Sequence, residues 1–184
     1  SVLRDIGLVA ITLLSLKLTP SQVHADNQFS WGPIQEVAKL FAGIFLTIIP
    51  VIAMLKAGVN GPFGSVVAAV TQPDGTPDVV MYFWITGFLS SFLDNAPTYL
   101  VFFNTAGGDP QVLMTSMAST LAAISAGAVF MGANSYIGNA PNLMVKAIAE
   151  DRGIKMPSFF GYMAWSLCIL IPLFVIMTFI WFRP

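Results

Sequence analysis

The chain carries one acidic side chain, Asp94, in the middle of a long apolar stretch. Residues 79–93 before it and residues 95–108 after it have no charge. A carboxylate at membrane depth is costly, so such a residue is by default a functional-site hypothesis. Pro97 follows closely, and because proline lacks a backbone N–H it breaks or kinks a helix. We therefore predict an ion-binding site at Asp94, where freed backbone carbonyls can be partnered by a cation.

The composition is typical of a membrane protein. Hydrophobic residues make up 56% of the chain and charged residues 9%, whereas soluble domains average about 25% charged residues. The net charge of −1 gives no basic patch for nucleic acid. A single cysteine, Cys168, excludes an internal disulfide. The sequence shows no metal-ligand cluster, no nucleophile–base pair and no phosphate-binding loop.

The apolar segments predict an all-α, polytopic membrane protein with a re-entrant helical hairpin and a discontinuous transmembrane helix. Residues 1–184 are expected to form one membrane domain. The chain opens at Ser1 directly into an apolar segment, so we expect no signal peptide and interpret the sequence as the C-terminal repeat of a longer transporter. The predicted elements are a helix at 6–18, an interfacial plus transmembrane helix at 34–56, the hairpin at 79–106, the broken helix at 111–152 and a last transmembrane helix at 157–182.

Two structures fit the stretch around Asp94. Each apolar arm is about fifteen residues long, roughly 22 Å as a helix, which is shorter than a hydrocarbon core of about 30 Å. The arms form either a re-entrant hairpin with its tip near the middle of the membrane or a single span at 79–106 that breaks at Pro97. We favour the hairpin. Irregular backbone at that depth is tolerated only where protein or a water-filled cavity surrounds it.

A second break is predicted downstream. Residues 111–145 carry no charge, but residues 132–142 contain three asparagines, two glycines and a proline, which are poor helix formers. We expect a helix at 111–131, an unwound centre and a half-helix from Asn142 to Arg152. The string Asn-Ala-Pro occurs in both breaks, and two broken elements that meet near the midplane are a recurrent way to build a secondary-transporter site.

The polar side chains near the two breaks are the candidate ligands, because a hard cation such as sodium prefers oxygen atoms. Simpler roles stay open: Asp94 as a helix N-cap, Asn139 and Asn142 as hydrogen-bonding links between helices, and Lys146 reaching the membrane interface instead of the site. The candidate ion- and substrate-binding residues are Asp94, Asn95, Thr98, Ser90, Asn134, Asn139 and Asn142, with Asp94 as the sodium ligand.

Two strings, Asp-Asn-Ala-Pro-Thr-Tyr-Leu at 94–100 and Tyr-Ile-Gly-Asn-Ala-Pro-Asn at 136–142, resemble the ion transporter superfamily. This superfamily includes divalent anion–sodium symporters, citrate carriers, arsenite-efflux permeases and one class of sodium/proton antiporter. The resemblance covers nearly the whole chain as the second of two inverted repeats, and is nearest to bacterial sodium/proton antiporters and citrate transporters. It implies that residues 90–100 are a hairpin tip. The anion symporters carry Ser-Asn-Thr where this chain has Asp94 to Thr98.

This departure directs the functional hypothesis. A fixed carboxylate repels a carboxylate substrate unless a cation neutralises it, while burial and a nearby cation move its pKa in opposite directions. We therefore expect sodium/proton antiport, with Asp94 exchanging H⁺ for Na⁺. Sodium-coupled transport of citrate or a dicarboxylate is the alternative, and a non-transporting scaffold subunit is the alternative of another class. An enzyme is not expected, since Asp94 has no acid–base partner.

The resemblance also implies the partners. The protein is expected in the bacterial inner membrane, in contact with the lipid bilayer and with the N-terminal repeat of the same protein. Its small-molecule partners are the transported sodium ion and proton, without a resident cofactor. No nucleic-acid partner is expected, and a homodimer stays open because the sequence does not fix the oligomeric state.

Overall fold

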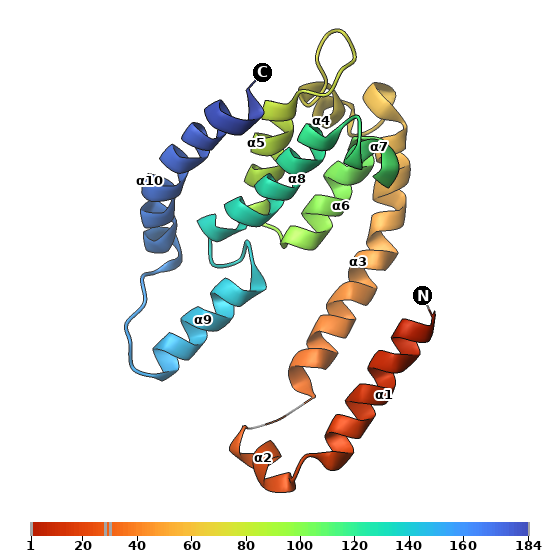
Figure 1. The fold of residues 1–184 in the computed structure, drawn as a ribbon. Helices are drawn as coiled ribbons and strands as arrows, with labels where there is room; N and C mark the ends of the chain where they lie inside the picture. Colours follow the sequence, from red (N-terminus) through yellow and green to blue (C-terminus); the bar gives the residue numbers. More distant parts are fainter. Residues whose placement is uncertain (1, 28, 30, 184) are drawn as a thin grey trace. The chain divides into compact units, whose positions relative to one another are not determined.

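The computed structural model describes residues 2–27, 29 and 31–183, and every regular element within these ranges is a helix (Figure 1). The all-α prediction is therefore confirmed for this part of the chain. The chain divides into two compact units, Ser1–Gly43 and Ile44–Pro184.

The first unit contains α1 (Val2–Leu18), α2 (Ser21–Asp26) and the beginning of α3 (Gly32–Lys56). α1 covers the helix predicted at 6–18 and starts earlier. Asp5 lies in its first turn, where an acidic side chain is stabilised by the positive end of the helix dipole.

The second unit contains the elements around Asp94. α5 (Val79–Ser90) and α6 (Asn95–Thr105) are joined by a short turn, and α8 (Ala118–Phe130) packs against both. Figure 1 shows these three helices side by side. The other elements are η1 (Gly58–Asn60), α4 (Gly64–Ala69), α7 (Pro110–Met114), the 3-10 turn η2 (Met131–Asn134), α9 (Ala140–Asp151), α10 (Phe159–Met177) and the π-helical turn η3 (Thr178–Phe182).

Two glycines allow α5 and α8 to approach each other closely. A Cβ on Gly87 would clash with the sulfur of Met131, and a Cβ on Gly127 would lie 2.5 Å from the carbonyl oxygen of Phe83. Small residues permit this backbone contact between membrane helices. The two helices therefore hold the start of η2 against the end of α5.

Aromatic side chains fill the core of the second unit. Phe83 is fully buried, and its ring centroid lies 4.8 Å from that of Phe182 and 6.2 Å from that of Phe174. Tyr82 meets Phe102 edge to face at 6.3 Å. Aromatic pairs at these separations stabilise beyond their buried area. These pairs hold α6, α10 and η3 against α5.

α10 and η3 form one apolar helix over Phe159–Phe182, with a mean hydropathy of 2.4. Among the described residues, it is the one helix that is long and apolar enough to cross a membrane. It occupies the position of the last transmembrane helix predicted at 157–182. Trp165 and Trp181 are 69% and 66% exposed, as expected of side chains that lie at a membrane–water interface.

The helix predicted at 111–131 is not continuous. The structure divides it at residues 115–117, between α7 and α8. The hydroxyls of Thr115 and Ser116 donate back to carbonyls of α7, and such side-chain bonds compete with helical bonding. The prediction was wrong here because neither glycine nor proline marks the break.

Candidate functional site

The first break is a tight turn between α5 and α6. α5 ends at Ser90, the last backbone bond to it runs from the N–H of Leu93 to the carbonyl of Leu89, and α6 begins at Asn95. Pro97 lies in the first turn of α6, where a missing N–H removes no helical hydrogen bond. The chain therefore breaks at residues 91–94, on the N-terminal side of Pro97, where the single-span alternative places the break. Insertion of this helical hairpin into a membrane as a re-entrant element stays a prediction.

Asp94 is the N-cap of α6 and is partly buried. One oxygen of its carboxylate accepts from the N–H of Ala96 at 3.3 Å. Its backbone carbonyl accepts from the hydroxyl of Thr98, a residue that is 1% exposed, at 3.0 Å. A carboxylate offers about four acceptor positions, so one long hydrogen bond leaves most of them open. Asp94 is thus a helix cap with spare acceptor capacity, and its role as an ion ligand stays a prediction.

The second break lies between η2 and α9. It covers residues 135–139, which is shorter than the predicted unwound segment at 132–142 because η2 extends to Asn134. Asn139 has an extended backbone and is the N-cap of α9, and Pro141 lies at the start of this helix. Both Asn-Ala-Pro strings therefore mark the start of a helix that follows a break.

Hydrogen bonds join the two breaks directly. The buried hydroxyl of Ser135 donates to the carbonyl oxygen of Ser91 at 2.5 Å, and the amide nitrogen of Asn134 donates to Oγ of Ser91 at 2.9 Å. A Cβ on Gly138 would lie 2.8 Å from the carbonyl oxygen of Ser90, so only glycine permits the backbones to approach this closely. The two segments therefore lie side by side, and we call this contact the junction.

Asn95 reinforces the junction from α6. Its side-chain nitrogen faces the carbonyl oxygens of Ala128 at 2.9 Å and Gly138 at 3.0 Å, and Oγ of Ser90 at 3.2 Å. We orient the amide with its nitrogen toward these atoms, because a carbonyl oxygen cannot donate to an amide oxygen. The hydroxyl of Ser90 donates to the same carbonyl of Ala128. Asn95 thus links α6 to α8 and to the second break.

The carbonyls freed by the second break are bonded by side chains. Asn142 Nδ2 donates to the carbonyls of Gly132 and Ser135, both at 3.2 Å. Tyr162 and Ser166 of α10 donate to the two carbonyls in between, at 3.0 and 2.6 Å. These four carbonyls therefore have protein donors, and each keeps one lone pair. Buried backbone carbonyls in native proteins are nearly always paired, and here side-chain donors supply the partners.

Three side chains at the breaks have oxygen atoms that accept few or no hydrogen bonds from described residues. They are the carboxylate of Asp94, the amide of Asn139, which accepts no capping hydrogen bond from α9, and Oδ1 of Asn134. Asn134 is 3% exposed, and its Oδ1 has no partner among the described residues. Carboxylate and neutral amide oxygens are both ligand types that a hard cation prefers. The described ranges contain no group of three or more His, Cys, Asp or Glu side chains.

All the candidate residues lie at or beside the two breaks, but sequence reasoning missed several side chains that bond them together. Ser91 and Ser135 lie in the breaks themselves, and Tyr162 and Ser166 reach them from α10. A hydroxyl inside an apolar helix, as at Ser166, is the signal that would have indicated a bond between helices.

Lys146 of α9 lies beside the second break and already has an acidic partner. Its ammonium pairs with Glu150 at 2.6 Å and lies 5.5 Å from the ring centroid of Tyr136. The break segments 90–100 and 131–142 contain no lysine or arginine. The acidic group of Asp94 is therefore the only full charge that the two breaks supply.

Comparison with known proteins identifies the family. No curated protein and no solved structure matches the chain. The family described as "Putative citrate transport" matches residues 1–182. Because this match covers nearly the whole sequence, the chain belongs to this family of transport proteins.

Proposed function

We propose that the protein is a secondary active transporter that couples the movement of citrate, or a related carboxylate, to a cation bound at Asp94. The family and the apolar helix α10–η3 support a membrane transport protein rather than an enzyme. The observation that carries the proposal is the junction of two helix breaks beside a partly buried carboxylate that keeps open acceptor positions.

The charges of the site explain why a cation is required. Residues 90–100 and 131–142 contain a carboxylate and no basic side chain, and the nearby Lys146 is already paired with Glu150. A bare citrate anion is therefore repelled until a cation neutralises Asp94. The helix starts at Asp94 and Asn139 place positive ends of α6 and α9 at the breaks. Such helix starts favour anionic groups. The cation therefore binds first, at Asp94 and the neutral oxygens, and the carboxylate follows at the helix starts.

Sodium/proton antiport is the second candidate. It is favoured by the isolation of Asp94, which is the single ionisable side chain with a charge at neutral pH between residues 79 and 108. In this mechanism the carboxylate exchanges H⁺ for Na⁺, and the absence of basic side chains from the breaks suits a cationic cargo. Both candidates assign the bound cation to Asp94, and both place the protein in a bacterial inner membrane with a first repeat that completes the site.

The test compares two fluxes in vesicles that contain the full-length protein. Uptake of radiolabelled citrate driven by a sodium gradient is the expected result. Sodium-dependent proton flux without citrate uptake would instead identify the protein as a sodium/proton antiporter. Asp94→Asn is expected to lower either flux by at least about tenfold. Asparagine is itself a good N-cap, so the variant removes the charge but keeps the helix start.

Asp109→Asn is the matched control. Asp109 is the N-cap of α7 and accepts from two backbone N–H groups there, so this variant changes a capping carboxylate outside the junction. We expect it to transport like the wild type. Full transport by Asp94→Asn would remove Asp94 from the mechanism, and the absence of both fluxes from the wild type would favour a scaffold subunit.

A further inference from the structure

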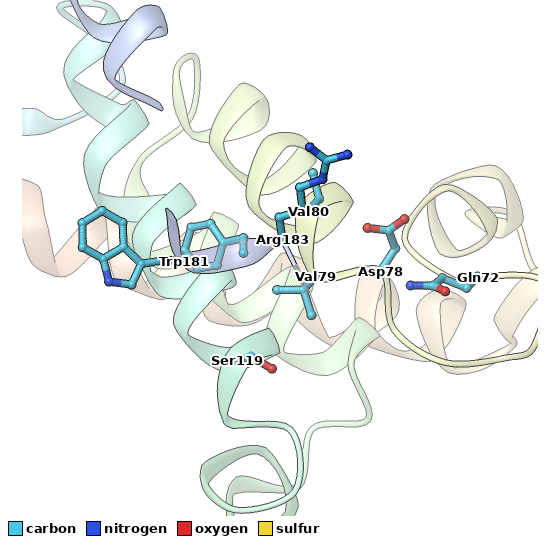
Figure 2. A pocket seen from close by; sticks show the side chains of 8 residues that line it. Gln72, Asp78, Val79, Val80, Ser119, Trp181 and Arg183 are labelled. Carbon is cyan, nitrogen blue, oxygen red and sulfur yellow. The ribbon is translucent and has the colours of Figure 1, made fainter. Parts of the chain in front are cut away.

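A separate pocket lies at the opposite end of α5 from Asp94. It has a volume of about 250 Å³ and lies between the loop before α5, the start of α8 and η3 (Figure 2). Its wall combines polar, charged and aromatic side chains. The lining residues that matter here are Gln72, Asp78, Ser119, Trp181, Phe182 and Arg183.

Two opposite charges border this pocket without neutralising each other. Asp78 caps α5 by accepting from the N–H of Met81 at 2.9 Å, which occupies one of its carboxylate oxygens. The guanidinium of Arg183 lies 5.1 Å from the ring centroid of Phe179. Within the described ranges neither charge forms an ion pair. A ligand that carries both signs would satisfy both side chains.

An apolar groove adjoins the pocket at Trp181 and Phe182. A second cavity of about 390 Å³ shares Trp181 and Phe182 with it and extends over α8 and α10. Ala122 and Ala126 lie on its α8 side, one helical turn apart. Their small side chains leave room for a long apolar chain. The combined site is therefore polar at the end of α10–η3 and apolar along the helix.

We propose that this site binds a zwitterionic phospholipid of the phosphatidylethanolamine type. Its phosphate accepts from Arg183, whose planar fork of donors matches phosphate oxygens. Its ammonium donates to Asp78, and one acyl chain lies in the groove between α8 and α10. Trp181 and Arg183 lie at the end of the apolar helix, where such side chains meet lipid headgroups.

The charges also predict a preference between headgroups. A purely anionic lipid satisfies Arg183 but places uncompensated negative charge beside Asp78, so phosphatidylethanolamine is preferred over phosphatidylglycerol. The site does not depend on which ion or carboxylate the junction carries, because it uses the other end of α5.

Native mass spectrometry of the purified full-length protein with defined lipids tests the proposal. The wild type is expected to retain phosphatidylethanolamine in preference to phosphatidylglycerol. Arg183→Gln is expected to reduce retention of both lipids by about tenfold, because the variant loses one charge-assisted hydrogen bond to the phosphate. Asp78→Asn keeps an N-cap and removes only the charge, so it is expected to reverse the preference toward phosphatidylglycerol.

Arg152→Gln, which removes an exposed arginine just after α9, is the control and is expected to retain lipid like the wild type. Helix content by circular dichroism verifies that each variant is folded. A wild type that prefers phosphatidylglycerol, or an Arg183→Gln variant that is folded and retains phosphatidylethanolamine fully, would overturn the assignment.

Discussion

Replacing Ser135 by alanine removes the side chain that bonds the two breaks most directly. Its hydroxyl donates to the carbonyl of Ser91 and accepts from the N–H groups of Ile137 and Gly138 at 3.2 and 3.0 Å. Ser135 is 0% exposed, so water does not replace these bonds. Each lost bond costs about 1 kcal/mol, or about 0.6 kcal/mol between membrane helices. We expect a loss of about 2–3 kcal/mol in the free energy of unfolding.

Unfolding by sodium dodecyl sulfate in mixed micelles, followed by circular dichroism, measures this loss. Ser116→Ala is the matched control, because Ser116 is exposed and its hydroxyl donates only to the carbonyl of Val112 at 3.3 Å. The control is expected to change the free energy of unfolding by less than about 0.5 kcal/mol. If Ser135→Ala is as stable as the control, the hydrogen bonds of Ser135 do not hold the breaks together.

Two further predictions test other parts of the second unit. Gly138→Ala is expected to separate the breaks and abolish transport, because its Cβ would lie 2.5–2.9 Å from three backbone oxygens. Gly7→Ala, with nothing within 4 Å, should transport normally, and equal transport by the two variants would contradict the packing. Thr76→Val is expected to raise the pKa of Asp74, since hydrogen bonds from Thr76 lower it. In the wild type the lowered pKa lets Asp74 contribute stability above the ordinary carboxyl pKa, and this stability is lost as the pH falls through the folded-state pKa. Thr76→Val reduces that contribution, and an unchanged carboxyl titration by NMR would refute the loop bonds.

Local signals located the turn at Asp94 from the sequence alone. A capping side chain and a proline in the first helical turn act within a few residues, so Asp94 and Pro97 predict a helix start without tertiary information. The same reasoning applies to Asn139 and Pro141 at the start of α9. The apolar run of α10 is long enough to identify by composition.

Long-range bonds were beyond such reasoning. The bond from Ser135 to the carbonyl of Ser91 joins residues 44 positions apart, and nothing local distinguishes this serine from others in the apolar segments. The hydroxyl of Ser166 inside an apolar helix does indicate a bond between helices, but nothing local identifies which carbonyl it or Tyr162 bonds to. The sequence therefore indicated where carbonyls become free, but not that protein side chains would bond four of them.

The bonding of the second break restricts how the transporter can move. Its carbonyls are bonded by α9 and α10, and its side chains bond to the turn between α5 and α6. A displacement of α10 past the break must release Tyr162 and Ser166 together, and a half-way position leaves buried oxygens without donors, at about 1–3 kcal/mol each. A closely packed region of this kind changes between discrete arrangements instead of deforming gradually. Access to Asp94 from the two sides of a membrane would accordingly alternate in single cooperative steps.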